Sequence, residues 1–312
     1  MSLSLVTNFL CTDRREGFNQ LDLSTFTKLR AFSWIGLHSE EDFEALKGCL
    51  RDNATHLQAL TLDLIDCQQN DFWSLDSGET NDEIPDLNNF FATDVMCLGQ
   101  DSPGLHFPTL ELLSLSEVSF KTAERSLASA FNFSRLQKLR LWNCPGMIEL
   151  LDDVANSYHA LPLVSLELVI DIHHAETLPE MEVSRFLQTI SGLRDLYLSL
   201  YVWDWEPVLE AVMNHLSSLK RLVLHGRGVD ADEDSLWFEE DADYSIEWNG
   251  PLSLLFELAE CDVMGIANPP NFMVSLLLPP PLIPPDRPLA RVPKWHRFPH
   301  ELQDAPPSSI MG

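Results

Sequence analysis

Leucines recur along the chain in a pattern that alternates buried and polar positions. The motif Leu-x-x-Leu-x-Leu predicts a short β-strand, because the side chains of a strand alternate between two faces and only one of these faces is apolar here. Strict copies of the motif begin at Leu57, Leu110, Leu136, Leu163, Leu193 and Leu219. A further copy, Leu29/Phe32/Trp34, has aromatic residues at two of its three positions.

The copies start at regular intervals. The copies at 29 and 57 are 28 residues apart. The five copies from 110 to 219 follow one another at intervals of 26, 27, 30 and 26 residues. The interval between the copies at 57 and 110 is 53 residues, close to two periods. Helical periodicity follows the copies in 40–51, 121–131, 147–158, 181–190 and 205–216. One strand and one helix cannot bury an apolar face alone, but stacked copies can. The sequence therefore predicts an α/β fold, a leucine-rich-repeat solenoid with a curved parallel sheet on the concave face and helices on the convex face.

Both ends of the array carry weaker copies. Ser2-Leu3-Ser4-Leu5-Val6 resembles half of such a strand, because Leu3 lies 29 residues before Phe32. At the other end, Val263-Met-Gly-Ile266 predicts a degenerate last strand after a helix at 252–260. The first strand has no polar cap before it, although the end of a solenoid needs one. We therefore expect that an upstream portion is missing or that something covers this edge.

Composition divides the chain into an array and a tail. Residues 1–268 form the predicted solenoid, which two acidic insertions near 68–87 and 228–250 interrupt. Residues 269–312 hold 12 of the 20 prolines, and proline cannot continue a helix or a central strand. This segment is therefore predicted to be a proline-rich tail or a cap on the last repeat.

The proline-rich segment is locally basic. Its basic residues include Arg287, Arg291, Lys294 and Arg297. This charge favours docking of the tail against the acidic repeat body, with Trp295 and Phe298 as apolar anchors. Short PxxP elements leave open a second interpretation, a ligand for an SH3-type domain.

The charge of the whole chain limits the classes of partner. The chain has 48 acidic and 20 basic residues and a formal net charge of −28. Such a field repels phosphate backbones and anionic membranes, so we expect no nucleic acid and no membrane among the partners. A protein with a basic surface would suit the field. The N-terminus is a poor signal peptide and no apolar run reaches membrane-spanning length, so we expect a protein of the cytoplasm or nucleus. We also expect a monomer.

The sequence shows no motif that would support catalysis. Asp230, Asp232 and Asp234 partly mimic a calcium loop, but Ser235 and Asp241 replace the expected glycine and glutamate. His173-His174 are adjacent and would point to opposite faces of a strand. The six cysteines lack metal-ligand spacing. We therefore expect no enzyme, no cofactor and no metal. The alternative left open is a divalent-metal-dependent hydrolase with its site in the acidic insertions.

Polar positions of the predicted strands face the concave surface. The candidate partner-binding residues are Lys138, Arg140, Trp142, Glu167, Asp195, Tyr197, Arg221 and His225. Trp, Tyr and Arg are common anchors of protein interfaces, so this surface favours a non-catalytic protein–protein interaction scaffold. The alternative is that these side chains pair across neighbouring strands, for instance Arg140 with Glu167.

The segment 26–66 carries a resemblance to a known group. Phe26-Thr-Lys-Leu-Arg-Ala-Phe-Ser-Trp-Ile-Gly-Leu37, a helix, and His56-Leu-Gln-Ala-Leu-Thr-Leu-Asp-Leu-Ile-Asp66 resemble fungal leucine-rich-repeat proteins, many of which are F-box proteins with arrays of the ribonuclease-inhibitor type. The resemblance implies the substrate-recognition part of an F-box-like ubiquitin-ligase receptor. No F-box helix bundle precedes the repeats in this sequence, so that role rests on analogy. A truncated repeat protein with no independent function is the remaining alternative.

Overall fold

The described residues form nine strands, which lie in one open sheet. The structure, a computed structural model, describes residues 1–7, 21–37, 40–64, 91–98, 104–121, 123–170, 179–201, 204–227 and 261–267. Every strand is parallel to its neighbours, and the order across the sheet is the order along the chain. The strands are β1 (Ser2–Val6), β2 (Ala31–Leu37), β3 (Ala59–Leu64), β4 (Leu112–Ser116), β5 (Lys138–Trp142), β6 (Ser165–Val169), β7 (Asp195–Tyr201), β8 (Arg221–Arg227) and β9 (Val263–Ala267).

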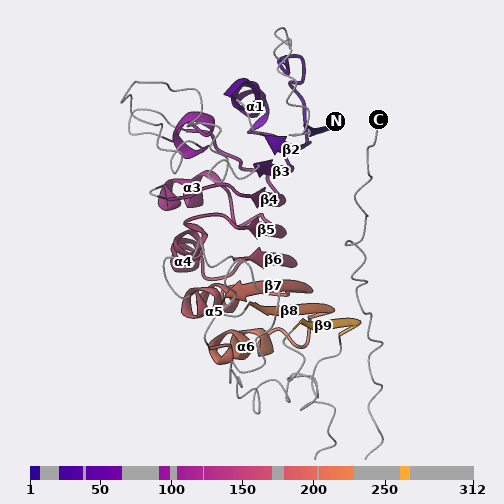
Figure 1. Ribbon diagram of the computed structural model, residues 1–312, viewed down its shortest axis with the longest axis vertical. Helices are drawn as coiled ribbons and strands as arrows, with labels where there is room; N and C mark the ends of the chain where they lie inside the picture. Colours follow the sequence, from indigo (N-terminus) through magenta and orange to yellow (C-terminus); the bar gives the residue numbers. More distant parts are fainter. Residues whose placement is uncertain are drawn as a thin grey trace, which may run out of the picture.

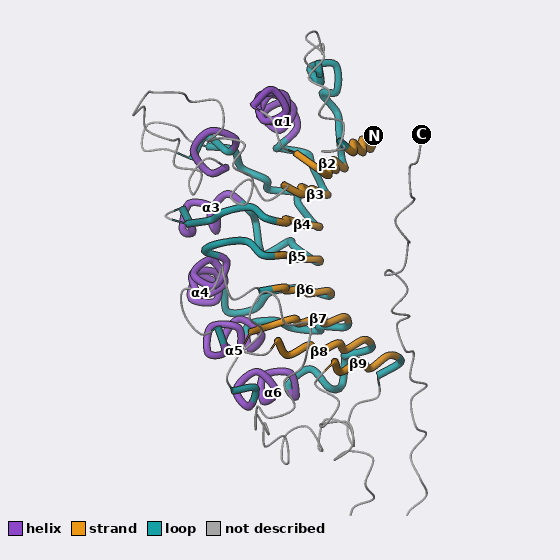
Figure 2. The backbone as a smooth tube through the Cα atoms, in the orientation of Figure 1, coloured by secondary structure: helices purple, strands orange, loops and turns teal. Residues whose placement is uncertain are grey.

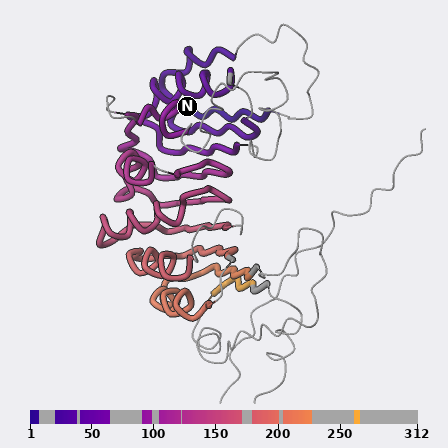
Figure 3. The backbone as a smooth tube through the Cα atoms, turned by 60° about the vertical axis from the view of Figure 1, so that its left-hand side comes forward, coloured from indigo at the N-terminus to yellow at the C-terminus, as the bar shows by residue number. Residues whose placement is uncertain are grey.

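The helices stack in a second column beside the strands (Figures 1 and 2). They are α1 (Glu40–Asn53), a π-helical turn η2 (Phe91–Val95), α3 (Glu124–Ala130), α4 (Met147–Ser157), α5 (Glu180–Gln188) and α6 (Glu206–Met213). The helix column bows outward on the side away from the strands (Figure 1), and the turned view in Figure 3 shows the same stack of repeats. This is the predicted leucine-rich-repeat solenoid, with helices on its convex side.

Motif leucines of successive strands meet in two rows that face the helices. One row joins Leu60, Leu113, Leu139, Leu166, Leu196 and Leu222, and the next joins Leu62, Leu115, Leu141, Leu168, Leu198 and Leu224. All are at most 2% exposed. Burial of a leucine side chain contributes about 1.5–3 kcal/mol, so these rows supply much of the stability of the stack.

The predicted weak strands at both ends are present. β1 pairs with β2 so that Leu3 lies opposite Phe32 and Leu5 opposite Trp34, as the interval of one period requires. β9 places Met264 beside Leu222. Phe32 and Trp34 are buried like the leucines they replace and pack edge to face.

Within its described residues, the double-length interval between the copies at 57 and 110 adds no strand between β3 and β4. β3 pairs directly with β4, with Leu60 opposite Leu113. The interval contributes η2, whose bond from Met96 N–H to Phe91 C=O spans five residues, and η2 takes a helix position in the column beside α1. Phe91, Ala92 and Val95 are buried there.

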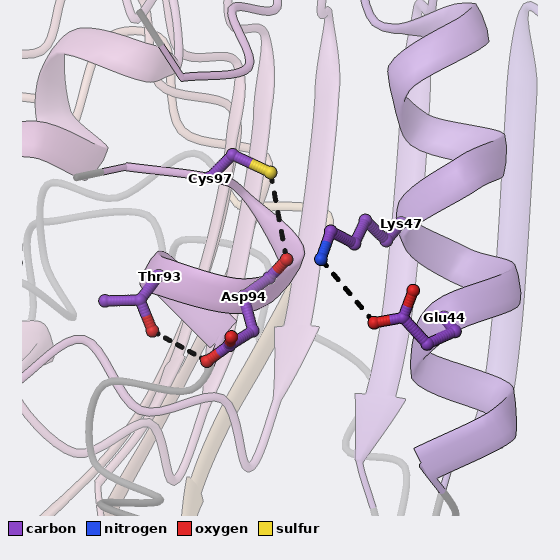
Figure 4. Close-up of polar contacts among 5 residues, drawn as sticks. All are labelled: Glu44, Lys47, Thr93, Asp94 and Cys97. Carbon is purple, nitrogen blue, oxygen red and sulfur yellow. Dashed lines mark hydrogen bonds and ion pairs between the residues drawn. The ribbon is translucent and has the colours of Figure 1, made fainter. Parts of the chain in front are cut away.

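Polar contacts around α1 and η2 are local. Figure 4 shows Lys47 and Glu44 of α1, whose Nζ and Oε1 atoms are 3.5 Å apart, and Thr93 Oγ1, which donates to Asp94 Oδ2 at 2.8 Å. Cys97 Sγ donates to the Asp94 carbonyl at 3.8 Å. Exposed local contacts of this kind contribute little to stability. The buried apolar side chains therefore account for most of the stability of this part of the column.

Asn53 connects the end of α1 to the start of the same repeat. Its side chain is 1% exposed. The Oδ1 atom accepts a hydrogen bond from Leu29 N–H at 2.8 Å, while Nδ2 donates to the Phe26 and Cys49 carbonyls at 2.6 and 2.8 Å. Buried backbone groups need hydrogen-bond partners, and the Asn53 amide supplies them to the backbone N–H and C=O groups of the segment that leads into β2.

Asn53→Ala is expected to lower the free energy of unfolding by about 2–3 kcal/mol, because it leaves the buried Leu29 N–H and Phe26 carbonyl without their partner. Urea denaturation followed by circular dichroism measures this change. Asn156→Ala is the matched control, since Asn156 lies on the exposed surface of α4, where its Nδ2 donates to Asp152 Oδ2 at 3.0 Å. Equal effects of the two substitutions would contradict the role of Asn53.

His215 links α6 to α5 from within the protein. It is 4% exposed, and its Nε2 lies 3.0 Å from the Leu187 carbonyl, to which a neutral ring donates its Nε2 proton. Burial lowers the pKa of His215 below its ordinary value of 6.5, and the carbonyl only partly opposes this effect. The folded protein thus favours the neutral ring.

The free energy of unfolding is expected to decrease as the pH falls below about 6.5. Over that range the unfolded chain takes up a proton at His215 and the folded chain does not, which gives a slope of at most about 1.4 kcal/mol per pH unit. Denaturation midpoints at pH 7.5, 6.5 and 5.5 measure it. His215→Gln should flatten the slope, whereas His159→Gln, at an exposed position, should not. An unchanged slope in His215→Gln would disprove the assignment.

Candidate protein-interaction surface

We call the side of the sheet that faces away from the helices, which is the concave side of the solenoid, the outer sheet face. Its side chains form a regular lattice. Because the strands pair in register, outward positions of successive strands align in three rows. The first row is Ser2, Ala31, Ala59, Leu112, Lys138, Ser165, Asp195, Arg221 and Val263; the second is Ser4, Ser33, Thr61, Ser114, Arg140, Glu167, Tyr197, Val223 and Gly265; the third is Val6, Ile35, Asp63, Ser116, Trp142, Val169, Ser199 and His225.

The candidate residues named from the sequence lie together on four neighbouring strands of this face. β5 contributes Lys138, Arg140 and Trp142; β6 contributes Glu167; β7 contributes Asp195 and Tyr197; and β8 contributes Arg221 and His225. Strands β1–β4 present mainly serine, alanine and threonine at the equivalent positions. The face is therefore divided into a half with small side chains and a half with large and charged ones.

Charged side chains of the outer sheet face pair across neighbouring strands. Arg140 Nε lies 3.0 Å from Glu167 Oε2, and Arg221 Nε donates to Asp195 Oδ1 at 2.6 Å. The hydrogen bond from Arg221 lowers the pKa of Asp195. With Arg140 and Arg221 side chains 47% and 64% exposed, each pair contributes at most about 1 kcal/mol to stability. The pairing expected as an alternative to binding is thus present, and it leaves both guanidinium groups accessible to solvent.

Trp142 is the large aromatic residue that projects from the charged half. It is 45% exposed at the end of β5. Its backbone is held on both sides, because the Trp142 carbonyl accepts a bond from Glu117 N–H at 2.9 Å and the following Asn143 N–H donates to the Val169 carbonyl at 2.8 Å. The ring is therefore presented from a rigid position.

The turn after β5 reinforces this position. Glu117 and Asn143 follow equivalent strand ends with left-handed φ angles of 57° and 49°, and Asn143 Nδ2 donates to Glu117 Oε1 at 3.0 Å. Cys144, which follows Asn143, is buried, and its thiol contacts the Leu115 and Trp142 carbonyls. Burial raises the pKa of Cys144 to about 12, so this thiol is neutral and structural.

Ser199 and His225 form a pair that sequence reasoning did not identify. The Ser199 Oγ and His225 Nδ1 atoms are 3.1 Å apart on β7 and β8, at directly paired positions. A serine beside a histidine is part of many nucleophilic sites. Here Ser199 is only 1% exposed, so a substrate has no access to its hydroxyl group. The register of the repeats, applied to both strands, could have predicted the contact.

The two sides of the solenoid differ in charge. On the outer sheet face the basic residues Lys138, Arg140 and Arg221 balance the acidic residues Asp63, Glu167 and Asp195. The helices are acidic: they carry Glu41, Asp42, Glu44, Asp52, Glu124, Glu149, Asp152, Asp153, Glu180, Glu182, Glu206 and Glu210 against Lys47, Arg51, Arg125 and Arg185. The negative charge of the described repeats therefore lies mainly on the helix side.

Other candidate sites lie outside the described residues. These are the calcium-loop-like segment 230–241, the pair His173-His174, both acidic insertions and the proline-rich tail. Within the described ranges, no group of three or more His, Cys, Asp or Glu side chains could hold a metal ion. In the same part of the chain, no helix has the length and apolar character needed to cross a bilayer.

Comparison with known proteins does not add a family to this picture. No family model matches the chain, and the search of curated proteins finds no significant match.

Proposed function

We propose that this protein is a non-catalytic interaction scaffold that binds a protein partner on the β5–β8 half of the outer sheet face. The observation that carries the proposal is Trp142, a large aromatic side chain that stays 45% exposed on a rigid strand end. Exposed tryptophan on a rigid element is typical of the anchors that supply most of the energy of a protein interface.

Neighbouring side chains support a binding role for the same half. Arg140 and Arg221 can each donate further hydrogen bonds, because a guanidinium group has five N–H donors and each is bonded through Nε. Tyr197 lies between Glu167 and Val223 in the second row and is half-buried. Protein interfaces are enriched in aromatic and arginine residues, and these residue types cluster on the β5–β8 half of the outer sheet face.

The balanced charge of this face indicates the chemistry of the partner. A strongly basic partner would meet as many basic as acidic groups here. We propose instead a partner surface with an apolar residue to cover Trp142 and mixed charges beside the two ion pairs. The resemblance to F-box-associated repeat proteins further favours a substrate-recognition role in a ubiquitin-ligase receptor, and this finer role is part of the proposal.

Trp142→Ala is expected to weaken binding of the partner about 30-fold, which corresponds to about 2 kcal/mol for loss of an anchor residue. Arg140→Glu should also weaken binding, because it removes the donors and places a carboxylate opposite Glu167. Affinity capture from cell lysate with the full chain identifies the partner, and calorimetry with that partner measures Kd for each variant.

Arg125→Glu on α3 is the matched control for Arg140→Glu, since its side chain is 91% exposed on the helix side. Met181→Ala, 58% exposed on α5, is the control for loss of an exposed apolar side chain. Both controls should bind normally. Weakened binding in the controls together with normal binding in the sheet-face variants would place the interface on the helices and refute the proposal.

A further inference from the structure

The helix side has a groove that the proposed function does not use. It lies between α3, α4 and α5 and has a volume of about 430 Å³. Its lining includes the carboxylates of Glu124, Glu149, Asp152, Asp153 and Glu182.

The carboxylates of the groove are only partly neutralised. Arg185 pairs with Asp152, and Arg125 Nε lies 3.6 Å from Asp153. Glu149 and Glu182 make no ion pair with any described residue. Three neighbouring helices thus present more negative than positive charge to one concave surface, and this surface favours a cationic occupant.

We propose that the basic segment 287–297 of this same chain docks in the groove. The segment carries Arg287, Arg291, Lys294 and Arg297, and no acidic residue occurs between 287 and 300. In a chain with 20 basic and 48 acidic residues, this is a concentrated run of positive charge. The segment lies outside the described residues, and the proposal does not depend on the partner-binding role of the outer sheet face.

The spacing of the basic residues matches the spacing of the helices. Pro288 and Pro293 favour an extended polyproline II conformation, in which three or four residues span about 9–12 Å. Packed helices are about 8–10 Å apart. A segment laid across α3, α4 and α5 can therefore bring one cation to each helix.

The chain is long enough for this arrangement. β9 ends at Ala267, and the path to the groove runs back about four strand spacings, or roughly 19 Å, to the level of β5. Passing around the repeat to the outside of the helix layer adds roughly 20 Å, two helix diameters. Residues 268–286 span about 60 Å when extended, so the linker can cover the distance with slack.

Attachment to the same chain favours this occupant over a free basic protein. A covalently linked segment has an effective concentration of the order of millimolar. Trp295 lies within the basic run and Phe298 directly follows it, so the segment also carries two aromatic side chains. Charge and proximity therefore both favour this one segment.

Photo-crosslinking of the full chain tests the proposal. A benzoylphenylalanine residue placed at Phe298 should form crosslinks within one chain to peptides of α3, α4 or α5, identified by mass spectrometry. The yield should fall at least about fivefold in about 1 M salt, where the screening length shrinks to about 3 Å. Glu149→Gln with Glu182→Gln should reduce the yield by a similar factor.

A control with the same loss of charge separates docking in the groove from attraction to the whole body. Glu206→Gln with Glu210→Gln removes two exposed acidic side chains of α6, outside the groove, and should leave the yield unchanged. Equal loss in both double variants would overturn the proposal. So would crosslinks to the outer sheet face, crosslinks between two chains, or no crosslink at all.

Discussion

The whole structure depends on burial of motif leucines between stacked repeats. A parallel ladder alone would allow neighbouring strands to slip by one residue, but a slip by one would turn every leucine of that strand to solvent. The buried rows through Leu60 and Leu62 are continuous across six strands, so the apolar core holds each strand to one register. The same constraint determines which residues become neighbours on the opposite face. The ion pairs and the place of Trp142 are consequences of that register.

Much of the fold follows from this periodicity and could be predicted from the sequence. The interval between Leu3 and Phe32 was sufficient to place β1, although only half a motif is present. The interval between 57 and 110 spans about two periods, yet β3 pairs directly with β4, and the described residues of the interval add the turn η2. Periodicity detects apolar faces that stack, and it cannot tell how an insertion between two copies is accommodated. The predicted helix at 121–131 spans Glu124–Ala130 in the structure, and it ends where Phe131 leaves the helix to bridge Phe107.

The sequence was enough to predict which residues lie on the candidate surface, but not which of them are paired or buried. Alternation alone places Arg140 and Glu167 on one face, and register places them side by side. Whether their charges are free or paired depends on side-chain torsions, which a sequence pattern does not specify. The contact between Ser199 and His225 is similar: two polar residues in paired positions were visible, but the near-complete burial of Ser199 was not. Burial depends on everything that surrounds a side chain, and a local motif contains no information on distant segments.

The two sides of the solenoid differ in net charge and therefore in the electrostatic forces that they exert on nearby molecules. The field of a strongly acidic chain decays within about 8 Å at physiological ionic strength, so it acts on molecules near the helices far more than on those at the balanced sheet face. The proposed recognition at the sheet face would therefore rest on short-range interactions, namely cover of the Trp142 ring and hydrogen bonds to already paired guanidinium groups. A partner gains little from breaking such a pair, because the loss of one contact offsets the new one. The favourable arrangement leaves each ion pair intact and adds acceptors to its unused N–H groups, which requires a partner whose polar groups match the spacing of the strands.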